Sequence, residues 1–313
     1  MRYYRFFSAV GGMAMLVSLL ASEGRSEAIP NQDKGTKSAE LIVEKPDYTG
    51  YELVWNDEFE RDGAPDPAKW NDEQGFVRNH EPQFYQRRNA VCRGGVLVIE
   101  GKKETVANPR YVEGSSDWRQ ARKEARYTSA SLTTRGKFAW KYGRFEARAR
   151  FAPREGMWPA FWTMGVEEGW PACGEIDIME YYQFLYLANL CWSSPKPGIG
   201  HWSTTRTPLS YFAAKDPMWA SSFHVFRMDW DENEIKLYAD DILLNRTRID
   251  AIRNDRFKNV ENPFRQPHYI ILNLAMGATG GSLDELPLPQ TFEVDYVRVY
   301  QKRGAPTAAA ARE

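Results

Sequence analysis

Short stretches in which hydrophobic and polar residues alternate recur along most of the chain. The clearest are residues 96–100, 143–151, 223–230 and 235–239. Acidic turn sequences at residues 231–233 and 240–241 separate some of them. Because a period of two is typical of strands with one buried face, these stretches predict short β-strands joined by turns. Few stretches have a helical period and no internal repeat is visible, so the pattern predicts an antiparallel β-sandwich.

The most informative stretch is residues 174–181, Gly-Glu-Ile-Asp-Ile-Met-Glu-Tyr. Successive side chains of a strand point to opposite faces, so Glu175 and Asp177 share one face. Strict alternation would then bury Glu180 among the isoleucines. We therefore predict a β-bulge at residues 178–179, whose extra residue returns Glu180 to the acidic face.

Three carboxylates on one face repel one another, and this repulsion can separate their pKa values. Separated pKa values allow one carboxyl group to act as an acid while another acts as a nucleophile, as glycoside hydrolysis requires. The alternative explanation is a half-exposed strand with a solvated acidic face. The spacing alone does not say which glutamate would take which role.

Two further motifs give this stretch a context. Residues 142–148 read Tyr-Gly-Arg-Phe-Glu-Ala-Arg, and residues 158–162 read Trp-Pro-Ala-Phe-Trp. Residues 170–181 then join Trp-Pro-Ala-Cys to the acidic stretch. Together these motifs resemble glycoside hydrolase family sixteen, and within it the bacterial laminarinase-like branch of endo-β-1,3- and mixed-linkage glucanases. The resemblance extends from residues 53–59 to residues 295–300, nearly the whole chain after its leader.

The resemblance implies a fold and a mechanism. The fold is an all-β, concanavalin A-like jelly-roll sandwich over residues 49–302, with a substrate cleft on its concave face. Glu175 would be the nucleophile, Glu180 the general acid/base, and Asp177 the group between them that tunes both. The implied reaction is an endo-acting double displacement that retains the anomeric configuration and uses no cofactor.

Sugar-binding and metal-binding positions also follow from the resemblance and from the neighbours of these motifs. The expected substrate-binding residues are Trp158, Trp162, Trp170, Asn79, Glu81, Asn189 and Trp192. For Trp162, a place in the core is the alternative. Glu58 and Asp295 match positions that hold a structural calcium ion on the convex face, since carboxylate oxygens suit this hard cation.

Two departures from the laminarinase pattern affect the expected substrate. Laminarinases usually continue with a His-Gly-Thr segment where this chain has residues 187–194, and they tend to carry Arg where it has Ser131. Losing an imidazole and a guanidinium would change which hydroxyl groups the cleft binds. We expect a β-1,3- or mixed-linkage glucan, with a β-galactan (agarose, porphyran or poly-lactosamine) as the alternative. A carbohydrate-binding sandwich without hydrolysis is the alternative class.

One segment near the acidic stretch stays open between two interpretations. Residues 195–209, with His201 and Trp202, resemble an insertion. They would form either a loop at the cleft rim that contacts sugars or a plain exposed loop.

Composition agrees with a polysaccharide substrate. The 313-residue chain has 41 basic and 42 acidic residues, and this balance argues against nucleic acid or a membrane surface as a partner. Its 11 Trp and 16 Tyr residues exceed what one core requires, and their flat rings suit sugars. We expect a monomer.

The first residues predict export. A charged start, an apolar run over residues 6–21 and Ser26-Glu27-Ala28 match a signal peptide over residues 1–28, so we expect a secreted or periplasmic protein. The apolar run is shorter than the roughly 20 residues of a spanning helix. Residues 29–48 read as a flexible lead-in and residues 303–313 as a disordered tail.

The three cysteines, Cys92, Cys173 and Cys191, are an odd number for an exported protein. A bridge between Cys173 and Cys191 would require their strands to pair. A small buried hydrophobic role is the main expectation for each cysteine. The four histidines are scattered, so a zinc site has no support.

Overall fold

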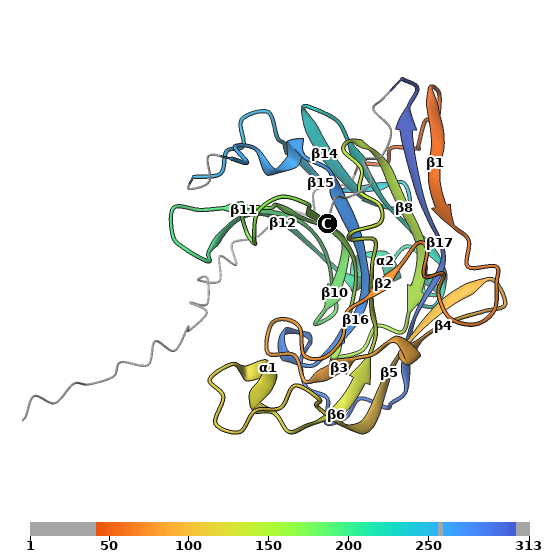
Figure 1. Ribbon diagram of the computed structural model, residues 1–313. Coiled ribbons are helices and arrows are strands. Elements are labelled where there is room, and N and C mark those ends of the chain that lie inside the picture. The colour runs from red at the N-terminus through yellow and green to blue at the C-terminus, as the bar shows by residue number, and fades with distance from the viewer. Residues whose placement is uncertain (1–41, 256–258, 305–313) are drawn as a thin grey trace, which may run out of the picture. The chain divides into compact units, whose positions relative to one another are not determined.

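Two β-sheets packed face to face form most of residues 42–255 and 259–304, which are the residues that the computed structural model describes (Figure 1). The ten-stranded sheet contains β1 (Tyr51–Asp57), β3 (Gln83–Tyr85), β4 (Ala90–Arg93), β5 (Val96–Ala107), β6 (Glu124–Ser129), β8 (Gly143–Phe151), β13 (His224–Trp230), β14 (Glu234–Ala239), β15 (Ile242–Arg248) and β17 (Gln290–Lys302). The seven-stranded sheet contains β2 (Asn71–Asp72), β7 (Ser131–Thr133), β9 (Met157–Gly165), β10 (Glu175–Tyr182), β11 (Leu185–Ser193), β12 (Gly200–Pro208) and β16 (His268–Met276). The predicted β-jelly-roll sandwich is confirmed.

Helices are short and lie between the strands. They are α1 (Trp118–Ala121), α2 (Leu209–Ala213) and the 3-10 turns η1 (Arg87–Asn89), η2 (Trp219–Ser221), η3 (Pro263–Arg265) and η4 (Ala278–Gly280). Among the residues described, no helix is long and apolar enough to cross a membrane. The predicted signal peptide and most of the predicted lead-in and tail lie outside the described residues.

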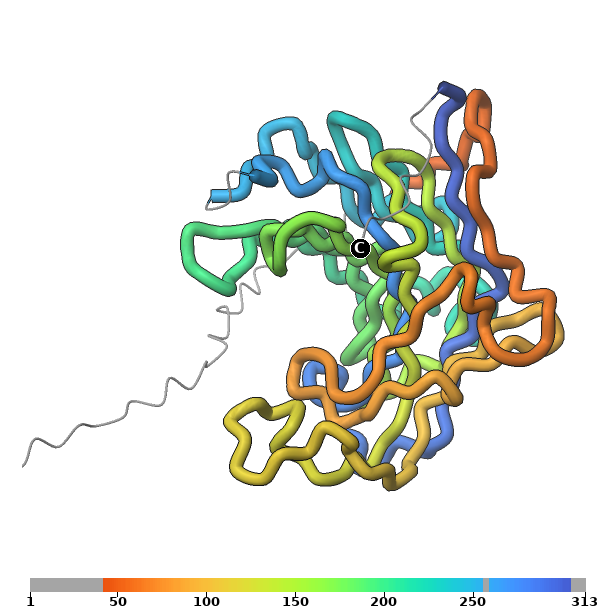
Figure 2. Tube along the Cα trace, viewed as in Figure 1, coloured from red at the N-terminus to blue at the C-terminus, as the bar shows by residue number. Residues whose placement is uncertain are grey.

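Strand pairing joins segments that are far apart in the sequence. β1 pairs antiparallel with β17, so the two ends of the described chain lie side by side (Figure 2). The seven-stranded sheet runs in the order β12-β11-β10-β9-β16-β7-β2, which puts β10 near its middle. The sheet curves, so that β12 lies toward one rim and the segment with β3 and α1 toward the other (Figure 1).

Side chains from both sheets meet in one large core. Alternate residues of each strand point inward, and Phe145, Ile176, Met228, Leu272 and Val297 are all fully buried there. Burial of a large apolar side chain contributes roughly 1.5–3 kcal/mol, so this layer supplies most of the stabilisation that fixes the curved sheet. The strands predicted from alternation are confirmed, and β5 extends well beyond its predicted end.

The predicted β-bulge is confirmed in β10. On the β9 side, Asp177 is opposite Trp162 and Met179 is opposite Phe161, so the residue between them is extra. Pairing with β11 shifts at the same place. Ile178 and Met179 are both buried in the core as a result, and the chain emerges with Glu180 on the side of Asp177.

The segment expected to be a loop at residues 195–209 instead contains an edge strand. β12 pairs with β11 through nine consecutive residues, from Gly200 opposite Ser193 to Pro208 opposite Leu185. This pairing satisfies the backbone hydrogen-bonding groups along one edge of β12. It makes β12 the outermost of the seven strands.

Residues 42–48, expected to belong to a flexible lead-in, lie against the ten-stranded sheet. Val43 forms a backbone bridge with Ile242. The Tyr238 hydroxyl donates to Glu44 Oε2 over 2.7 Å. The Tyr48 hydroxyl donates to a Glu146 carboxylate oxygen, also over 2.7 Å. The expectation was wrong here because these polar side chains have partners on distant strands.

The three cysteines are free and buried. Cys191 is opposite Glu175 in the β10–β11 pair, and Cys173 lies two residues before Glu175. Burial raises the pKa of the Cys92 thiol to about 11 and that of the Cys173 thiol to about 12. The expected role as small buried side chains is confirmed, and the bridge between Cys173 and Cys191 does not form.

Candidate active site

The bulged strand places Glu175, Asp177 and Glu180 on the face of the seven-stranded sheet that points away from the core, here called the carboxylate face. Asp177 is buried, whereas the two glutamates are partly exposed on either side of it. The predicted row of three carboxylates is therefore present.

Asp177 binds its proton more tightly than an ordinary aspartate. Burial raises its pKa well above the usual value, and the charges of Glu175 and Glu180 raise it further. A hydrogen bond between Asp177 and Glu175 raises the pKa of Asp177 and lowers that of Glu175. This bond therefore favours a proton on Asp177 and a negative charge on Glu175.

Glu175 accepts a hydrogen bond from an indole of the β9–β10 loop. The Trp170 Nε1–H donates to its Oε2 over 2.5 Å, and this bond stabilises the ionised form. Burial acts in the opposite direction and is the larger effect, so the pKa of Glu175 is raised above its ordinary value. Trp170 comes from the loop between β9 and β10, and its side chain is exposed.

Glu180 has the pKa of a group that exchanges protons near neutrality. Burial raises its pKa to about 7, and the charges of Glu175 and Glu81 add to that rise. The Trp158 Nε1–H donates to Glu180 Oε1 over 2.6 Å and opposes the rise by stabilising the charge. Burial is thus the largest cause of a raised pKa for all three carboxyl groups of the row.

Asn189, expected to bind substrate, lies opposite Asp177 on β11. Its Nδ2 donates to Asp177 Oδ2 over 3.1 Å and to Glu180 Oε2 over 3.3 Å. One neutral amide thus holds two carboxyl groups in place, and this does not change their summed charge.

The segment between β2 and β3 brings Glu81 to the same face. Glu81 is buried and accepts hydrogen bonds from Gln83 Nε2, the Tyr85 hydroxyl and Asn79 Nδ2. Burial raises its pKa despite these donors. Asn79 is exposed and has a positive φ of 55°, a conformation that Asn tolerates better than most residues. The structure therefore brings both predicted residues into the site.

Trp162 lies on the carboxylate face but is buried. Its Nε1–H donates to Asn273 Oδ1 over 2.7 Å, and it packs with Ile271 and Tyr269 in a small cluster separate from the main core. The Arg78 guanidinium lies 5.1 Å from the centre of its ring. Trp162 is thus covered by neighbouring side chains and has a structural role in the site.

A guanidinium lies near the carboxylate face despite the serine at position 131. Arg78 is paired with Glu73, whose Oε2 also accepts a hydrogen bond from the Ser131 hydroxyl over 2.6 Å. Among the residues described, Arg78 Nη1 is buried without a partner. The expected loss of a cationic group was wrong, because a residue 53 positions earlier supplies it. No signal in the sequence marked Arg78.

Trp192 was expected to bind substrate, and this prediction was wrong. It directly follows Cys191, which shares the face of Glu175, so its side chain points to the opposite face. There it packs against the main core, with its ring 6.3 Å from that of the buried Phe264.

The two carboxylates expected to bind calcium do not form a cation site. Glu58 accepts two hydrogen bonds from Arg298, over 2.8 and 2.9 Å, and Asp295 accepts one from Arg148 over 2.6 Å. A calcium ion would have to displace these guanidinium groups, so the residues do not fit it. Within residues 42–255 and 259–304, no three His, Cys, Asp or Glu side chains are grouped to hold a metal ion.

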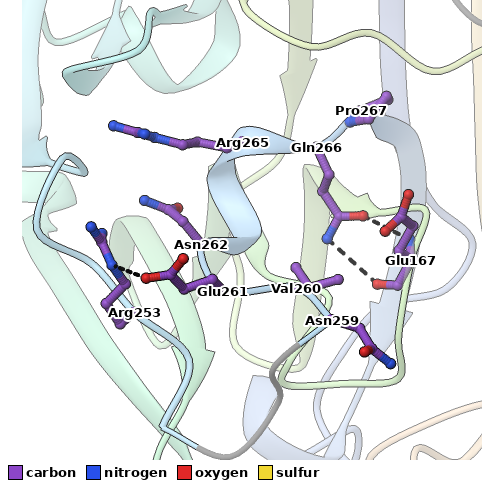
Figure 3. Close-up of a pocket in the computed structure, with 9 residues that line it drawn as sticks. All are labelled: Glu167, Arg253, Asn259, Val260, Glu261, Asn262, Arg265, Gln266 and Pro267. Carbon is purple, nitrogen blue, oxygen red and sulfur yellow. Dashed lines mark hydrogen bonds and ion pairs between the residues drawn. The ribbon is translucent and has the colours of Figure 1, made fainter.

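A pocket of about 330 Å³ lies apart from the carboxylates, between the β9–β10 loop and the segment around η3 (Figure 3). Its polar groups bond to one another. Arg253 pairs with Glu261 over 2.7 Å, and Gln266 Oε1 accepts from the Glu167 backbone N–H over 2.7 Å. This pocket contributes nothing to the carboxylate row.

A jelly-roll sandwich that holds a row of carboxyl groups with raised pKa values on one face fits the architecture of a glycoside hydrolase. The chain belongs to glycosyl hydrolases family 16, because its residues 105–298 match the model of that family.

Relatives within the family act on different glycans. The chain is 35% identical over 271 residues to a β-glucanase of Rhodothermus marinus, covering 80% of this chain and 85% of the relative. It is 29% identical over 313 residues to a keratan-sulfate endo-1,4-β-galactosidase of Sphingobacterium multivorum, covering 96% and 68%. A solved structure from work on endo-acting O-glycanases of the human gut microbiota, which initiate mucin breakdown, superposes with a TM-score of 0.73 at 32% identity, covering 83% and 94%.

Proposed function

We propose that this protein is an exported, endo-acting glycoside hydrolase that cleaves a β-linked polysaccharide with retention of configuration. The observation that supports this most strongly is the row of Glu175, Asp177 and Glu180 on one strand face, in which burial raises the pKa of Glu180 to about 7. The proposed export rests on the signal-like residues 1–28.

In the first step, Glu175 attacks the anomeric carbon while Glu180 gives its proton to the leaving glycosidic oxygen. The bond from Glu175 to the sugar forms as the glycosidic bond breaks. The hydrogen bonds from Trp170 and Asp177 favour the charged form of Glu175, which is the form that attacks.

In the second step, Glu180 acts as a base. Having lost its proton, it takes one from a water molecule that attacks the same carbon and releases Glu175. A pKa of about 7 suits a group that must be an acid in one step and a base in the next. Trp158 and Asn189 hold its two oxygens in place throughout. No cofactor takes part in the proposed chemistry.

For the substrate, we propose a β-1,3- or mixed-linkage glucan first, because the β-glucanase relative shares 35% identity over most of both chains. A β-galactan is the second candidate. It is favoured by the likeness to the keratan-sulfate galactosidase over 96% of this chain, and by Asn189 and Ser131, which replace the usual glucanase residues.

A substrate panel distinguishes these candidates. Laminarin, mixed-linkage β-glucan, agarose, porphyran, carrageenan, poly-lactosamine and keratan sulfate are each incubated with the protein, and the products are sized by chromatography. We expect a glucan to yield a ladder of oligosaccharides. Cleavage of a galactan and of neither glucan would reverse the substrate assignment, and binding without new reducing ends would support a carbohydrate-binding role instead.

The two indole donors should control opposite limbs of the pH profile. Trp158→Phe removes the donor that lowers the pKa of Glu180, so the alkaline limb of kcat/KM should move to higher pH. Trp170→Phe removes the donor to Glu175, so the acid limb should also move to higher pH. Shifts of about half a unit to one unit are expected for loss of one such hydrogen bond.

Trp162→Phe is the matched control, since its N–H bonds to Asn273 and not to a carboxylate. It should leave both limbs in place. If Trp158→Phe moved the acid limb, or Trp170→Phe the alkaline one, the roles of the two glutamates would be reversed.

A further inference from the structure

The edge strand β12 carries a second row of side chains, which runs beside the carboxylate row. Glu175 is opposite Cys191, which is opposite Trp202. In the same way Glu180 is opposite Leu187, which is opposite Arg206. Cross-strand partners share a face, so Trp202 and Arg206 lie on the carboxylate face.

Only the buried side chains of β11, here called the floor, lie between the two rows. Adjacent strands lie about 4.8 Å apart, so the rows are roughly 10 Å from each other. The side chains of β11 between them are Cys191, Asn189 and Leu187, which are all buried. Trp202, by contrast, is 47% exposed. Trp170, the donor to Glu175, is 45% exposed beside the same floor.

The other face of β12 has a different character. His201 pairs with Asp255 over 2.8 Å, and the Ser203 hydroxyl bonds to that of Thr247 over 2.7 Å. These side chains therefore have partners within the fold. An exposed indole on an edge strand favours association with other chains. Because this is a cost to the fold, the exposure of Trp202 indicates a binding role.

Arg206 is exposed and free of a carboxylate partner within residues 42–255 and 259–304. It contacts the hydroxyl of Tyr182, and its charge lowers the pKa of Glu180. Its side chain lies on the carboxylate face, where oxygen atoms of a ligand would accept hydrogen bonds from its guanidinium.

We propose that Trp202 and Arg206 form a sugar-binding subsite on β12, two strands away from the carboxylates of β10. The indole of Trp202 stacks on the apolar face of a hexose unit of the substrate chain. The guanidinium of Arg206 donates hydrogen bonds to oxygens of that chain. This inference rests on the proposed function, since it places a further unit of the same polysaccharide chain at a distance from the bond that is cleaved.

Only a long substrate chain would gain binding energy from a subsite at this distance from the bond that breaks. A short oligosaccharide that fills only the positions beside Glu175 and Glu180 would not reach β12. A longer one would gain contact with Trp202, and this gain would appear in kcat/KM.

The test compares Trp202→Ala and Arg206→Gln with wild type on oligosaccharides of increasing length from the best polysaccharide of the panel. Trp202→Ala should lower kcat/KM roughly tenfold on long oligosaccharides, mainly through KM, with little change on the shortest substrate. Arg206→Gln should show the same length dependence. A greater loss on a sulfated chain than on its desulfated form would assign Arg206 to acidic groups, and equal losses to hydroxyl groups.

His201→Ala is the matched control for Trp202, because it removes the neighbouring ring from the opposite face. Arg248→Gln is the control for Arg206, as an exposed arginine on the other sheet. Neither should change the length dependence. Equal activity of Trp202→Ala and wild type at every length would contradict the subsite, and so would a loss of the same size at every length.

Failure of the proposed function is distinguishable from failure of this inference. If wild type hydrolysed no polysaccharide of the panel, the proposed function would fail. Calorimetric titration with the polysaccharides would then test the subsite alone. Weaker binding by Trp202→Ala than by wild type and His201→Ala would support it, whereas equal binding, or no binding by any of the three, would overturn it.

Discussion

Glu175→Gln and Glu180→Gln will each lower kcat by at least about 10³-fold on the best polysaccharide substrate. Glutamine keeps the size of the side chain but can neither form the glycosyl bond nor transfer the proton. The measurement is the release of reducing ends at saturating substrate. Glu52→Gln, at the start of β1 and far from the site in the sequence, is a control that should keep full activity. Near-normal turnover by either active-site variant would contradict the assigned roles.

The same substitutions should not weaken the fold, and Glu180→Gln should strengthen it at alkaline pH. The folded protein raises the pKa of Glu180 from 4.5 to about 7, so the fold disfavours its charged form. The stabilising effect of that proton is complete below pH 4.5 and is lost as the pH rises through 7. The glutamine variant does not undergo this loss.

Unfolding by urea at pH 4 and pH 8 measures this effect. At pH 8, Glu180→Gln should exceed wild type by on the order of 2–3 kcal/mol in its free energy of unfolding. At pH 4 the two should be nearly equal. A variant that lost activity because it had unfolded would instead be less stable at both values, and its inactivity would say nothing about catalysis.

Deletion of Met179 should destabilise the protein by about 2–5 kcal/mol and lower its activity. Without the extra residue, β10 would alternate strictly and Glu180 would stay on the face of Asp177, but the core would lose a large buried side chain. The strand would also lose the bend of its bulge, which helps to set the spacing between Glu175 and Glu180. Circular dichroism during urea unfolding, together with an activity assay, measures both effects.

Met179→Leu is the control for this deletion. It keeps the bulge and a large apolar side chain in the core, so it should cost less than about 1.5 kcal/mol and retain activity. A deletion variant that kept both stability and activity would show that neither the Met179 side chain nor the bend of the bulge is needed.

The bulge was predictable because the conflict that it resolves lies within six residues. Ile176 and Ile178 have to share the core face, and Glu180 cannot join them at low cost. Local periodicity carries this information wherever one face is buried and the other is polar. The predicted strands β8, β13 and β14 were recognised for the same reason.

β12 was missed because hydrophobic periodicity does not mark it. Its sequence, Gly-His-Trp-Ser-Thr-Thr-Arg-Thr-Pro, is mainly polar at both odd and even positions. An edge strand with little buried surface is held mainly by backbone hydrogen bonds to its neighbour, and these leave no pattern in the side chains.

The error at Trp192 was avoidable, whereas that at Glu58 and Asp295 was not. Trp192 lies three positions after Asn189, so on one strand the two must point to opposite faces. The arginines that pair with Glu58 and Asp295 come from other parts of the sequence. No spacing within the chain predicts such partners, and the place of Arg78 near Ser131 depends on tertiary structure in the same way.

The central claim is that Glu175 and Glu180 cleave a β-glycosidic bond by double displacement. Proton NMR during the first minutes of hydrolysis tests it most directly, because the two anomers of a new reducing end give separate signals. The account predicts that the β-anomer forms first and that the α-anomer follows only by mutarotation. An α-anomer formed first would show a single displacement by water, and would contradict the role of Glu175 as nucleophile.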